Sequence, residues 1–229
     1  MTIEEFAQHI DVTFNDIALL EQALTHRSYL NEDRSYKNGH NERLEFLGDA
    51  VLELVVTDYL YHNYDNPEGE LTRWRASLVN TDMLARVAKE LGVNDILRMS
   101  KGEAQDTNSR ARHHILANTI EAIIGAIYLD QGYAAARSFI LKKIVIHLEE
   151  VLTKKLYRDP KSYFQEQAQK HKNITPHYDV LETTGPDHDK SFVVGAYIGE
   201  ELIAKGTGRS KQDAQRAAAQ AALDAMQWQ

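Results

Sequence analysis

The stretch HNERLEFLGDAVLELVVTDYL, residues 40–60, carries acidic and apolar side chains on opposite sides of a predicted helix. At about 100° per residue, Glu42, Glu45 and Asp49 fall within an arc of about 60°. The opposite side is predicted to face the core, and it consists of Leu44, Leu47, Val51, Leu54 and Val55. This helix therefore has one stripe for packing and one concentrated stripe of carboxylates.

Three acids on a helix usually form a solvated face, but two observations argue against that interpretation here. No lysine or arginine stands four residues after any of the three acids, where a surface ion pair would place one. A second stretch, HHILANTIEAIIGAIYLD at residues 113–130, puts Asn118 and Glu121 on one helix face, and Gly125 continues that face. We therefore expect a close approach of the two helices that brings the acidic groups together.

Carboxylates that meet in this way repel each other unless a cation lies among them. The chain has no cysteine, so the candidate ligands are hard oxygen donors, which select Mg²⁺ or Mn²⁺ over zinc. A cation held by carboxylates is typical of phosphate chemistry.

The run Glu42-Arg43-Leu44-Glu45-Phe46-Leu47-Gly48-Asp49-Ala50 resembles the signature of the ribonuclease III family. Three further segments resemble the same family: Thr25–Tyr29, Glu68–Thr72 and Ile115–Asp130. The resemblance covers nearly the whole chain and matches the short bacterial arrangement of two domains.

This resemblance implies metal-dependent hydrolysis of double-stranded RNA that leaves 5′-phosphates and short 3′ overhangs. Ribosomal precursor RNA and messenger RNA are the implied substrates, and Mg²⁺, or Mn²⁺ in its place, is the implied cofactor. The implied metal ligands are Glu45, Asp49, Asn118 and Glu121, of which Asp49 and Glu121 are also assigned as catalytic. At the position of Asn118 the family usually has aspartate, so this ligand would bring no charge.

The resemblance also implies a homodimer in which each protomer supplies one strand-cutting site. Glu42 and Glu68 would line the same valley, in contact with RNA or in support of the metal. Phe46, which flanks the acids away from the apolar stripe, is predicted to lie in the dimer interface.

The spacing of apolar residues predicts an all-α domain over residues 1–155. A polar loop is predicted from Ser100 to Arg112. The predicted helices are residues 3–9, 16–23, 40–63, 71–91, 111–131 and 133–155.

A change of pattern near Asp159-Pro160, a typical helix start, predicts a second domain over residues 159–229. Its segments alternate like a small α+β fold of order α-β-β-β-α, which resembles a double-stranded-RNA-binding domain. The predicted elements are a helix to about residue 172, strands at 177–183, 190–198 and 201–206, and a helix at 211–227.

By this resemblance, three regions of the second domain meet RNA: its first helix, the loop between the first two strands, and the start of its last helix. Each alone is ordinary surface, and the combination on this fold carries the prediction. The predicted RNA-binding residues are Ser162, Gln165, Glu166, Gln169, His188, Lys190, Arg209, Ser210 and Lys211.

Bulk charge gives no sign of RNA binding, because 26 basic residues face 34 acidic ones and the net charge is -8. No apolar run approaches the roughly 18 residues of a membrane span, and the start of the chain does not look like a secretory signal. We therefore expect a cytoplasmic protein that binds duplex RNA through local basic patches and its metal, without a membrane partner.

Three hypotheses follow. The leading one is a homodimeric endoribonuclease for double-stranded RNA. The alternative is an RNA-binding protein of the same fold that hardly cuts, because Asn118 weakens the metal site. A purely structural helical dimer is the third, and it leaves the carboxylates and the second domain without a role.

Overall fold

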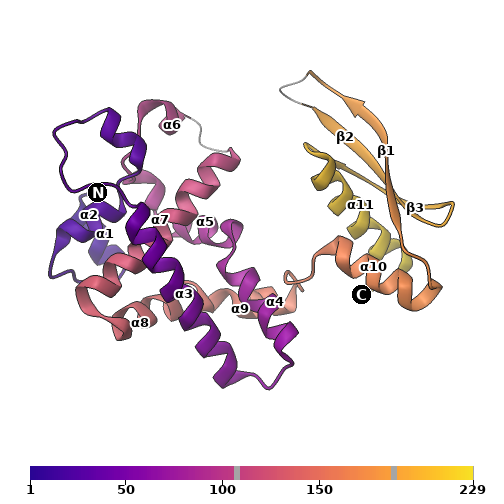
Figure 1. Cartoon of the computed structure of the whole chain (residues 1–229), viewed down its shortest axis with the longest axis horizontal. Helices are drawn as coiled ribbons and strands as arrows, with labels where there is room; N and C mark the ends of the chain where they lie inside the picture. The colour runs from indigo at the N-terminus through magenta and orange to yellow at the C-terminus, as the bar shows by residue number, and fades with distance from the viewer. Residues whose placement is uncertain (106–108, 187–189, 229) are drawn as a thin grey trace. The chain divides into compact units, whose positions relative to one another are not determined.

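The computed structural model describes residues 1–105, 109–186 and 190–228, and the chain divides into two compact units, Met1–Tyr157 and Arg158–Gln229. The first unit is helical and the second is a three-stranded sheet between two helices in sequence, as predicted (Figure 1). The helices of the first unit are α1 (Ile3–His9), α2 (Ile17–Ala23), η1 (Arg27–Asn31), α3 (Glu42–Asn63), α4 (Glu68–Val79), α5 (Thr81–Glu90), η2 (Val93–Asp95), α6 (Lys101–Gln105), α7 (Arg110–Gln131), α8 (Tyr133–Lys143), η3 (Val145–His147) and α9 (Leu148–Thr153).

Helix α7 is the centre of the first unit, since α2, α3, α5 and α8 all pack on it. Its sequence is apolar on nearly every side from Ile115 to Ile127, which suits a helix surrounded by others. The pair α3 and α7 forms the most extensive contact between any two elements. The two stretches that carry the acidic side chains are therefore the two that pack together.

The predicted helix over residues 71–91 is wrong in its continuity. Asn80 has an extended backbone, and its side-chain oxygen accepts a 2.9 Å hydrogen bond from Met83 N, which starts a new helix. The first of the two helices, α4, already begins at Glu68, directly after Pro67. The cap at Asn80 is a local signal that the apolar spacing does not reveal.

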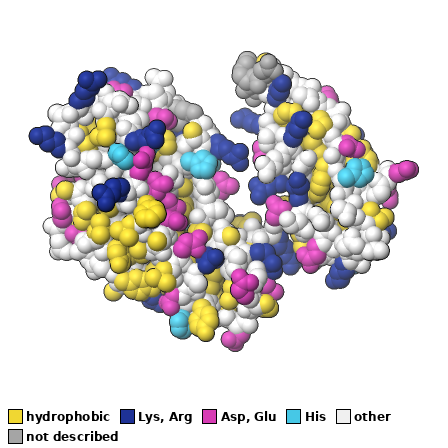
Figure 2. Space-filling view, in the orientation of Figure 1, with side chains coloured by type: hydrophobic (Ala, Val, Ile, Leu, Met, Phe, Trp, Pro, Cys, Tyr) yellow, Lys and Arg dark blue, Asp and Glu magenta, His cyan; other side chains and the backbone are white. Residues whose placement is uncertain are grey.

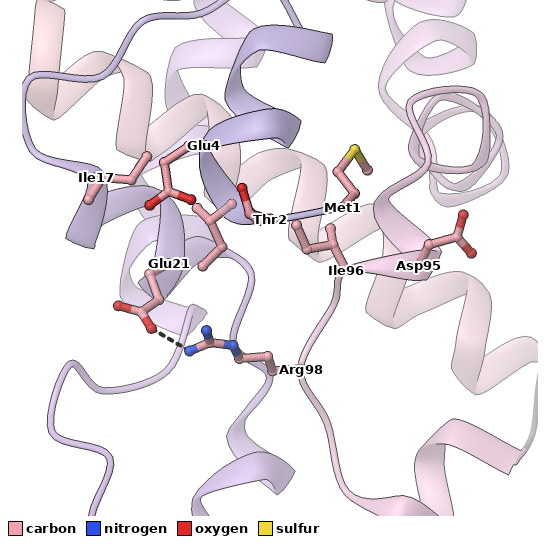
Figure 3. Close-up of a pocket in the computed structure, with 9 residues that line it drawn as sticks. Met1, Thr2, Glu4, Ile17, Glu21, Asp95, Ile96 and Arg98 are labelled. Atoms are coloured by element: carbon pink, nitrogen blue, oxygen red, sulfur yellow. Dashed lines mark hydrogen bonds and ion pairs between the residues drawn. The ribbon is translucent and has the colours of Figure 1, made fainter.

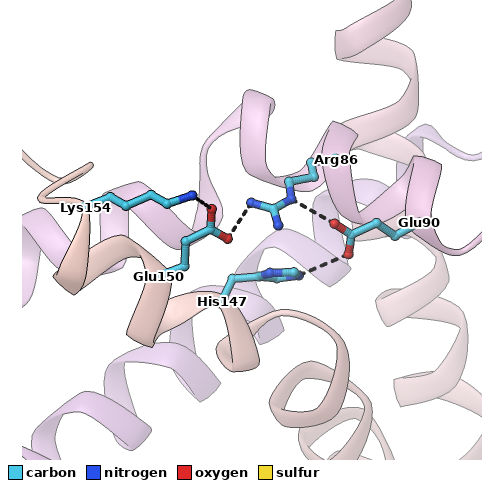
Figure 4. A network of polar contacts seen from close by, with 5 residues as sticks. All are labelled: Arg86, Glu90, His147, Glu150 and Lys154. Atoms are coloured by element: carbon cyan, nitrogen blue, oxygen red, sulfur yellow. Dashed lines mark hydrogen bonds and ion pairs between the residues drawn. The ribbon is translucent and has the colours of Figure 1, made fainter.

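The predicted helix over residues 133–155 is also divided, at Ile144, into α8, η3 and α9. A polar contact holds the last segment against α5: Arg86 of α5 pairs with Glu150 of α9 at 2.7 Å, and within α5 it also pairs with Glu90 at 2.8 Å (Figure 4). His147 Nε2 lies 3.3 Å from Glu90 Oε2 in the same network. In the predicted loop from residue 100 to 112, α6 forms and α7 begins at Arg110.

The apolar stripe of α3 differs from the prediction at one position. Leu54 is 57% exposed, while Leu44, Val51 and Val55 are buried as expected and Leu47 is half-buried. The core side instead includes residues between the predicted ones. It consists of Leu44, Gly48, Val51, Leu52, Val55, Val56 and Leu60.

The second unit is built from α10, an antiparallel sheet in the order β1-β2-β3, and α11. Its core joins Phe164, Val194 and Leu223, and Gly206 lets α11 lie directly on β3, because a Cβ there would be 2.1 Å from Ala218 N. The bounds are α10 (Pro160–Lys172), β1 (His177–Thr184), β2 (Ser191–Ile198), β3 (Glu201–Gly208) and α11 (Lys211–Met226).

Candidate active site and RNA-binding surface

The crossing of α3 and α7 brings Glu45 and Asp49 of one helix to Asn118 and Glu121 of the other. The pKa shifts show their proximity: Asp49 and Glu45 both raise the pKa of Glu121, and Asn118 lowers that of Glu45. Three of the four side chains are half-buried, and Asp49 is exposed. The result is a carboxylate cluster at the edge of the helix crossing, open to solvent on one side.

Burial and like charge both disfavour ionisation in this cluster. Burial raises the pKa of Glu121 to about 8, with Asp49 and then Glu45 adding to the shift. Burial also raises the pKa of Glu45, followed by Glu42, while the hydrogen bond from Asn118 opposes the rise. A bound cation would therefore stabilise the ionised forms of these carboxyl groups.

Asn118 has a function in this arrangement that the sequence did not suggest. It lies near enough to Glu45 across the two helices to oppose the rise that burial causes in the pKa of that carboxyl. An ionised aspartate has no hydrogen to donate, so it would add repulsion at the same place. Asn118 therefore favours the ionised form of Glu45.

The donor set fits a hard divalent cation, since it offers three carboxylates and one amide oxygen. In the part of the chain that the structure describes, no three His, Cys, Asp or Glu side chains already converge at ligand distance.

The two predicted supporting acids lie in different places. Glu42 stands one helical turn before Glu45, where its carboxylate pairs with Arg27 at 3.4 Å and faces His40 at 3.7 Å. Glu68 lies beyond the other end of α3, at the start of α4, and accepts a 2.8 Å hydrogen bond from Thr72. Within one protomer, the structure brings Glu42 to the cluster and leaves Glu68 apart from it.

Phe46 is the most exposed of the large apolar side chains, at 82%. Leu54 on the same helix and Leu129 near the end of α7 are also more than half exposed. Figure 2 shows hydrophobic side chains gathered over α3 and α8 beside a band of acidic ones. Large apolar side chains that are exposed together on one face are typical of a protein–protein contact.

In the second unit, four predicted RNA-binding residues share one exposed face of α10. Asp159 caps this helix by accepting a 2.9 Å hydrogen bond from Ser162 N, and Pro160 occupies its first turn. A shallow hollow along the helix is lined by Ser162, Gln165, Glu166, Gln169, Lys170 and Asn173. This polar face suits contact with the minor groove of a duplex.

The start of α11 presents exposed Arg209 and Lys211 on either side of Ser210, whose hydroxyl caps the helix by accepting from Asp213 N at 3.1 Å. Arg216, farther along α11, is paired with Asp159 at 3.2 Å. Lys190 is exposed before β2, and His188 lies outside the described residues.

Comparison with known proteins agrees with both units. Residues 16–148 match the family model described as Ribonuclease-III-like, and residues 160–226 match the double-stranded RNA binding motif. Ribonuclease 3 of Borreliella afzelii is 41% identical over 226 residues, which span 98% of this chain and 91% of that protein. Ribonuclease 3 of Oceanobacillus iheyensis is 44% identical over 230 residues, 99% of both chains. The chain belongs to the ribonuclease III family.

A solved nuclease domain of ribonuclease III, from Campylobacter jejuni, resembles the first unit. It has a TM-score of 0.55 and 41% identity, and the match covers 62% of this chain and 96% of that one. The Campylobacter study concerns structural flexibility in the region involved in dimer formation of that domain.

Membership of the ribonuclease III family confirms the predicted fold class, a helical nuclease domain followed by an α-β-β-β-α RNA-binding domain. The protein is a ribonuclease III-type endoribonuclease that acts on double-stranded RNA. The alternative of a binding protein that hardly cuts finds no support in these relatives. Among the described residues, no helix is both long and apolar enough to cross a membrane.

Proposed function

We propose that the reaction requires a divalent metal ion, Mg²⁺ or in its place Mn²⁺, held by Glu45, Asp49, Asn118 and Glu121. The meeting of these four side chains across the α3–α7 crossing carries the proposal, because carboxylates that raise one another's pKa values form a strong site for a cation. When bound, the ion supplies activation of water and stabilisation of negative charge on the phosphate.

Each polar side chain of the site has its own proposed role. Asp49 and Glu121 are the catalytic carboxylates, and a cation beside them favours their ionised forms. Asn118 favours the ionised form of Glu45, whose pKa it lowers. Glu42, one turn earlier on α3, lines the approach to the cluster, and Glu68 reaches the valley only when two protomers form it.

The proposed products are 5′-phosphate fragments with short 3′ overhangs, and the proposed active form is a homodimer. Two sites in a dimer cut opposite strands, and Phe46 lies in the interface between protomers. Its exposure of 82% beside the cluster supports this assignment. Ribosomal precursor RNA and messenger RNA are the proposed natural substrates, and the cytoplasm is the proposed place of the reaction.

The second unit is proposed to grip the duplex without reading its sequence. The α10 face around Gln165 meets a minor groove, while Lys190 and the start of α11 meet phosphates. Exposure of Gln165, Lys190, Arg209 and Lys211 supports these roles.

A cleavage assay tests the metal-dependent reaction. A long RNA duplex is incubated with the full chain in Mg²⁺, in Mn²⁺ or in EDTA, beside single-stranded RNA and a DNA duplex of the same sequence. We expect cleavage of the RNA duplex in both metals only, with ends that accept label after phosphatase treatment. Equal cleavage in EDTA would overturn the metal requirement.

Sedimentation of the full chain tests the dimer. Phe46→Asp is expected to convert a dimer into a monomer at micromolar concentration, because it puts a charge into an apolar contact. Ile174→Asp, which changes a 40% exposed apolar residue of the second unit, serves as the matched control. A parent chain that sediments as a monomer would rule out the dimer.

A further inference from the structure

Arg27 is an arginine held at the edge of the carboxylate cluster with its side chain facing solvent. It is the first residue of η1 and is 71% exposed, whereas the residues on either side of it are half-buried. Its guanidinium reaches Glu42, at 3.4 Å, and Glu42 stands one helical turn before Glu45. Only Glu42 therefore lies between the Arg27 guanidinium and Glu45 of the proposed active site.

The backbone that carries Arg27 is fixed on both sides. His26 N donates to the carbonyl oxygen of Arg98 at 2.9 Å, and Ser28 Oγ accepts from Ser100 N at 2.9 Å. The His26 ring also hydrogen-bonds Ser28 Oγ at 2.8 Å. With both neighbours turned inward, Arg27 is held pointing outward.

Arg98, which holds this segment through its backbone, is itself committed elsewhere. Its side chain donates to Glu21 (Figure 3). The same guanidinium lies over the rings of Tyr29 and Tyr36, about 6 Å from each centroid. Arg27 has no such environment, since its pair with Glu42 is solvent-exposed and weak. Replacing Glu42 by another anionic partner of the Arg27 guanidinium therefore costs little free energy.

The cluster itself offers little attraction to an RNA strand. Among the described groups that shift the pKa values of Glu45 and Glu121, none is a cation. Glu42 adds a further negative charge at the entrance, about 5–6 Å from Glu45 at the Cβ atoms. Beside the phosphate at the metal, a strand that passes Glu42 meets the Arg27 guanidinium, and an arginine fork binds phosphate oxygens in a bidentate manner.

We propose that Arg27 is a substrate-positioning residue, which releases Glu42 and binds a backbone phosphate of the duplex beside the phosphate that is cut. The inference rests on the proposed function, since it needs an RNA strand at the carboxylate cluster. Arg27 then fixes where the strand lies along α3, and the freed Glu42 carboxylate faces the cluster.

Duplex binding by the full chain in Ca²⁺, without cleavage, tests the phosphate contact. Arg27→Ala is expected to weaken binding about 3- to 10-fold and to lower the salt slope of the binding constant by about one, as for one lost phosphate contact. Arg34→Ala removes the same charge from an exposed side chain of the same segment, and we expect it to bind like the parent. Unchanged affinity and salt slope in Arg27→Ala would overturn the proposal.

A second pair of variants separates phosphate binding from mere neutralisation of Glu42. Glu42→Gln alone should tighten binding, because it frees Arg27, and Arg27→Ala should still weaken binding in the Glu42→Gln background. If Glu42→Gln instead erases the effect of Arg27→Ala, Arg27 only offsets the charge of Glu42 and the proposal fails.

Cleavage in Mg²⁺ at saturating enzyme completes the test. Arg27→Ala should cut roughly 10-fold more slowly even when all RNA is bound, because the strand is misplaced, and Arg27→Lys should recover only part of the rate. A parent chain that neither binds nor cuts duplex RNA would refute the proposed function. A parent that does both, matched in both by Arg27→Ala, would refute only the role of Arg27.

Discussion

Gly48 of α3 and Gly125 of α7 meet backbone to backbone where the two helices cross. A Cβ atom on Gly48 would lie 1.7 Å from the carbonyl oxygen of Glu121, and one on Gly125 would lie 2.2 Å from the carbonyl oxygen of Leu44. Both distances are far inside van der Waals contact, so neither position tolerates a side chain at this helix separation. The close approach is what brings the acids of α3 to those of α7.

The first prediction concerns this crossing. Gly48→Ala forces the helices apart, and we expect it to lower the free energy of unfolding by about 3 kcal/mol and to abolish cleavage. Gly69→Ala is the control, because its Cβ would meet only the end of the Arg73 side chain, at 3.8 Å. Urea unfolding followed by circular dichroism measures both variants. A Gly48→Ala protein as stable as the parent would contradict the packing account.

The acidic face was predictable because it depends on helical period alone. Glu45 and Asp49 on one helix, and Asn118 and Glu121 on the other, are fixed by spacings of three and four residues. Gly125 on the same face predicted the close approach, which the structure confirms.

Contacts between distant residues were not predictable in this way. The partner of Glu42 is Arg27, fifteen residues earlier, and no helical spacing connects them. Arg216 pairs with Asp159, which lies 57 residues earlier, and no local pattern connects these two residues either. Leu54 continues the apolar period yet is exposed, because the period of a helix does not distinguish a core from a surface that meets another protein.

The second prediction is that Glu121→Ala abolishes cleavage and leaves duplex binding nearly unchanged. Glu121 is half-buried among other acids, so it is placed to hold a cation and not a phosphate. We expect the rate in Mg²⁺ to fall by about 100-fold or more, since loss of one ligand removes several kcal/mol of stabilisation. The control is Glu149→Gln, an exposed acid of α9. Cleavage by Glu121→Ala at the parental rate would show that the metal assignment is wrong.

The third prediction concerns acid stability and the network that holds α9 against α5 (Figure 4). Lys154, and then Arg86, lower the pKa of Glu150 from its usual 4.5 to about 2. A lowered carboxyl pKa contributes stability that is present above about pH 4.5 and is lost as the pH falls toward 2. Glu150→Gln should therefore flatten the fall in unfolding free energy over this range.

The control for Glu150→Gln is Glu149→Gln, since Glu149 precedes Glu150 and is exposed. Unfolding free energies measured from pH 7 to pH 2 should keep the parental slope in Glu149→Gln and lose part of it in Glu150→Gln. Added salt should reduce the difference between the two variants, because exposed ion pairs are screened. Identical pH curves for all three proteins would show that the network contributes nothing.

The fourth prediction is that Lys211→Ala weakens binding to all RNA duplexes about equally. Lys211 is exposed in the first turn of α11, where a helix start and a basic side chain meet phosphate, which carries no sequence information. We expect about a 3- to 10-fold loss with a salt slope lower by about one. Lys205→Ala, an exposed lysine of β3, is the control. Loss restricted to particular base sequences would contradict this role.

The last prediction concerns Asn118, where the family usually has an aspartate. Asn118→Asp should raise the cleavage rate or lower the Mg²⁺ concentration for half-maximal rate, because Mg²⁺ favours charged oxygens. The same change replaces an amide that lowers the pKa of Glu45 with a carboxylate that repels it, so the metal-free protein should be less stable. Titration of Mg²⁺ on one duplex, beside thermal unfolding in EDTA, measures both effects. Asn31→Asp, at an exposed position of η1, is the control for added charge. If Asn118→Asp keeps both the rate and the metal dependence of the parent, the amide is a fully competent ligand, and a fourth carboxylate adds nothing to the site.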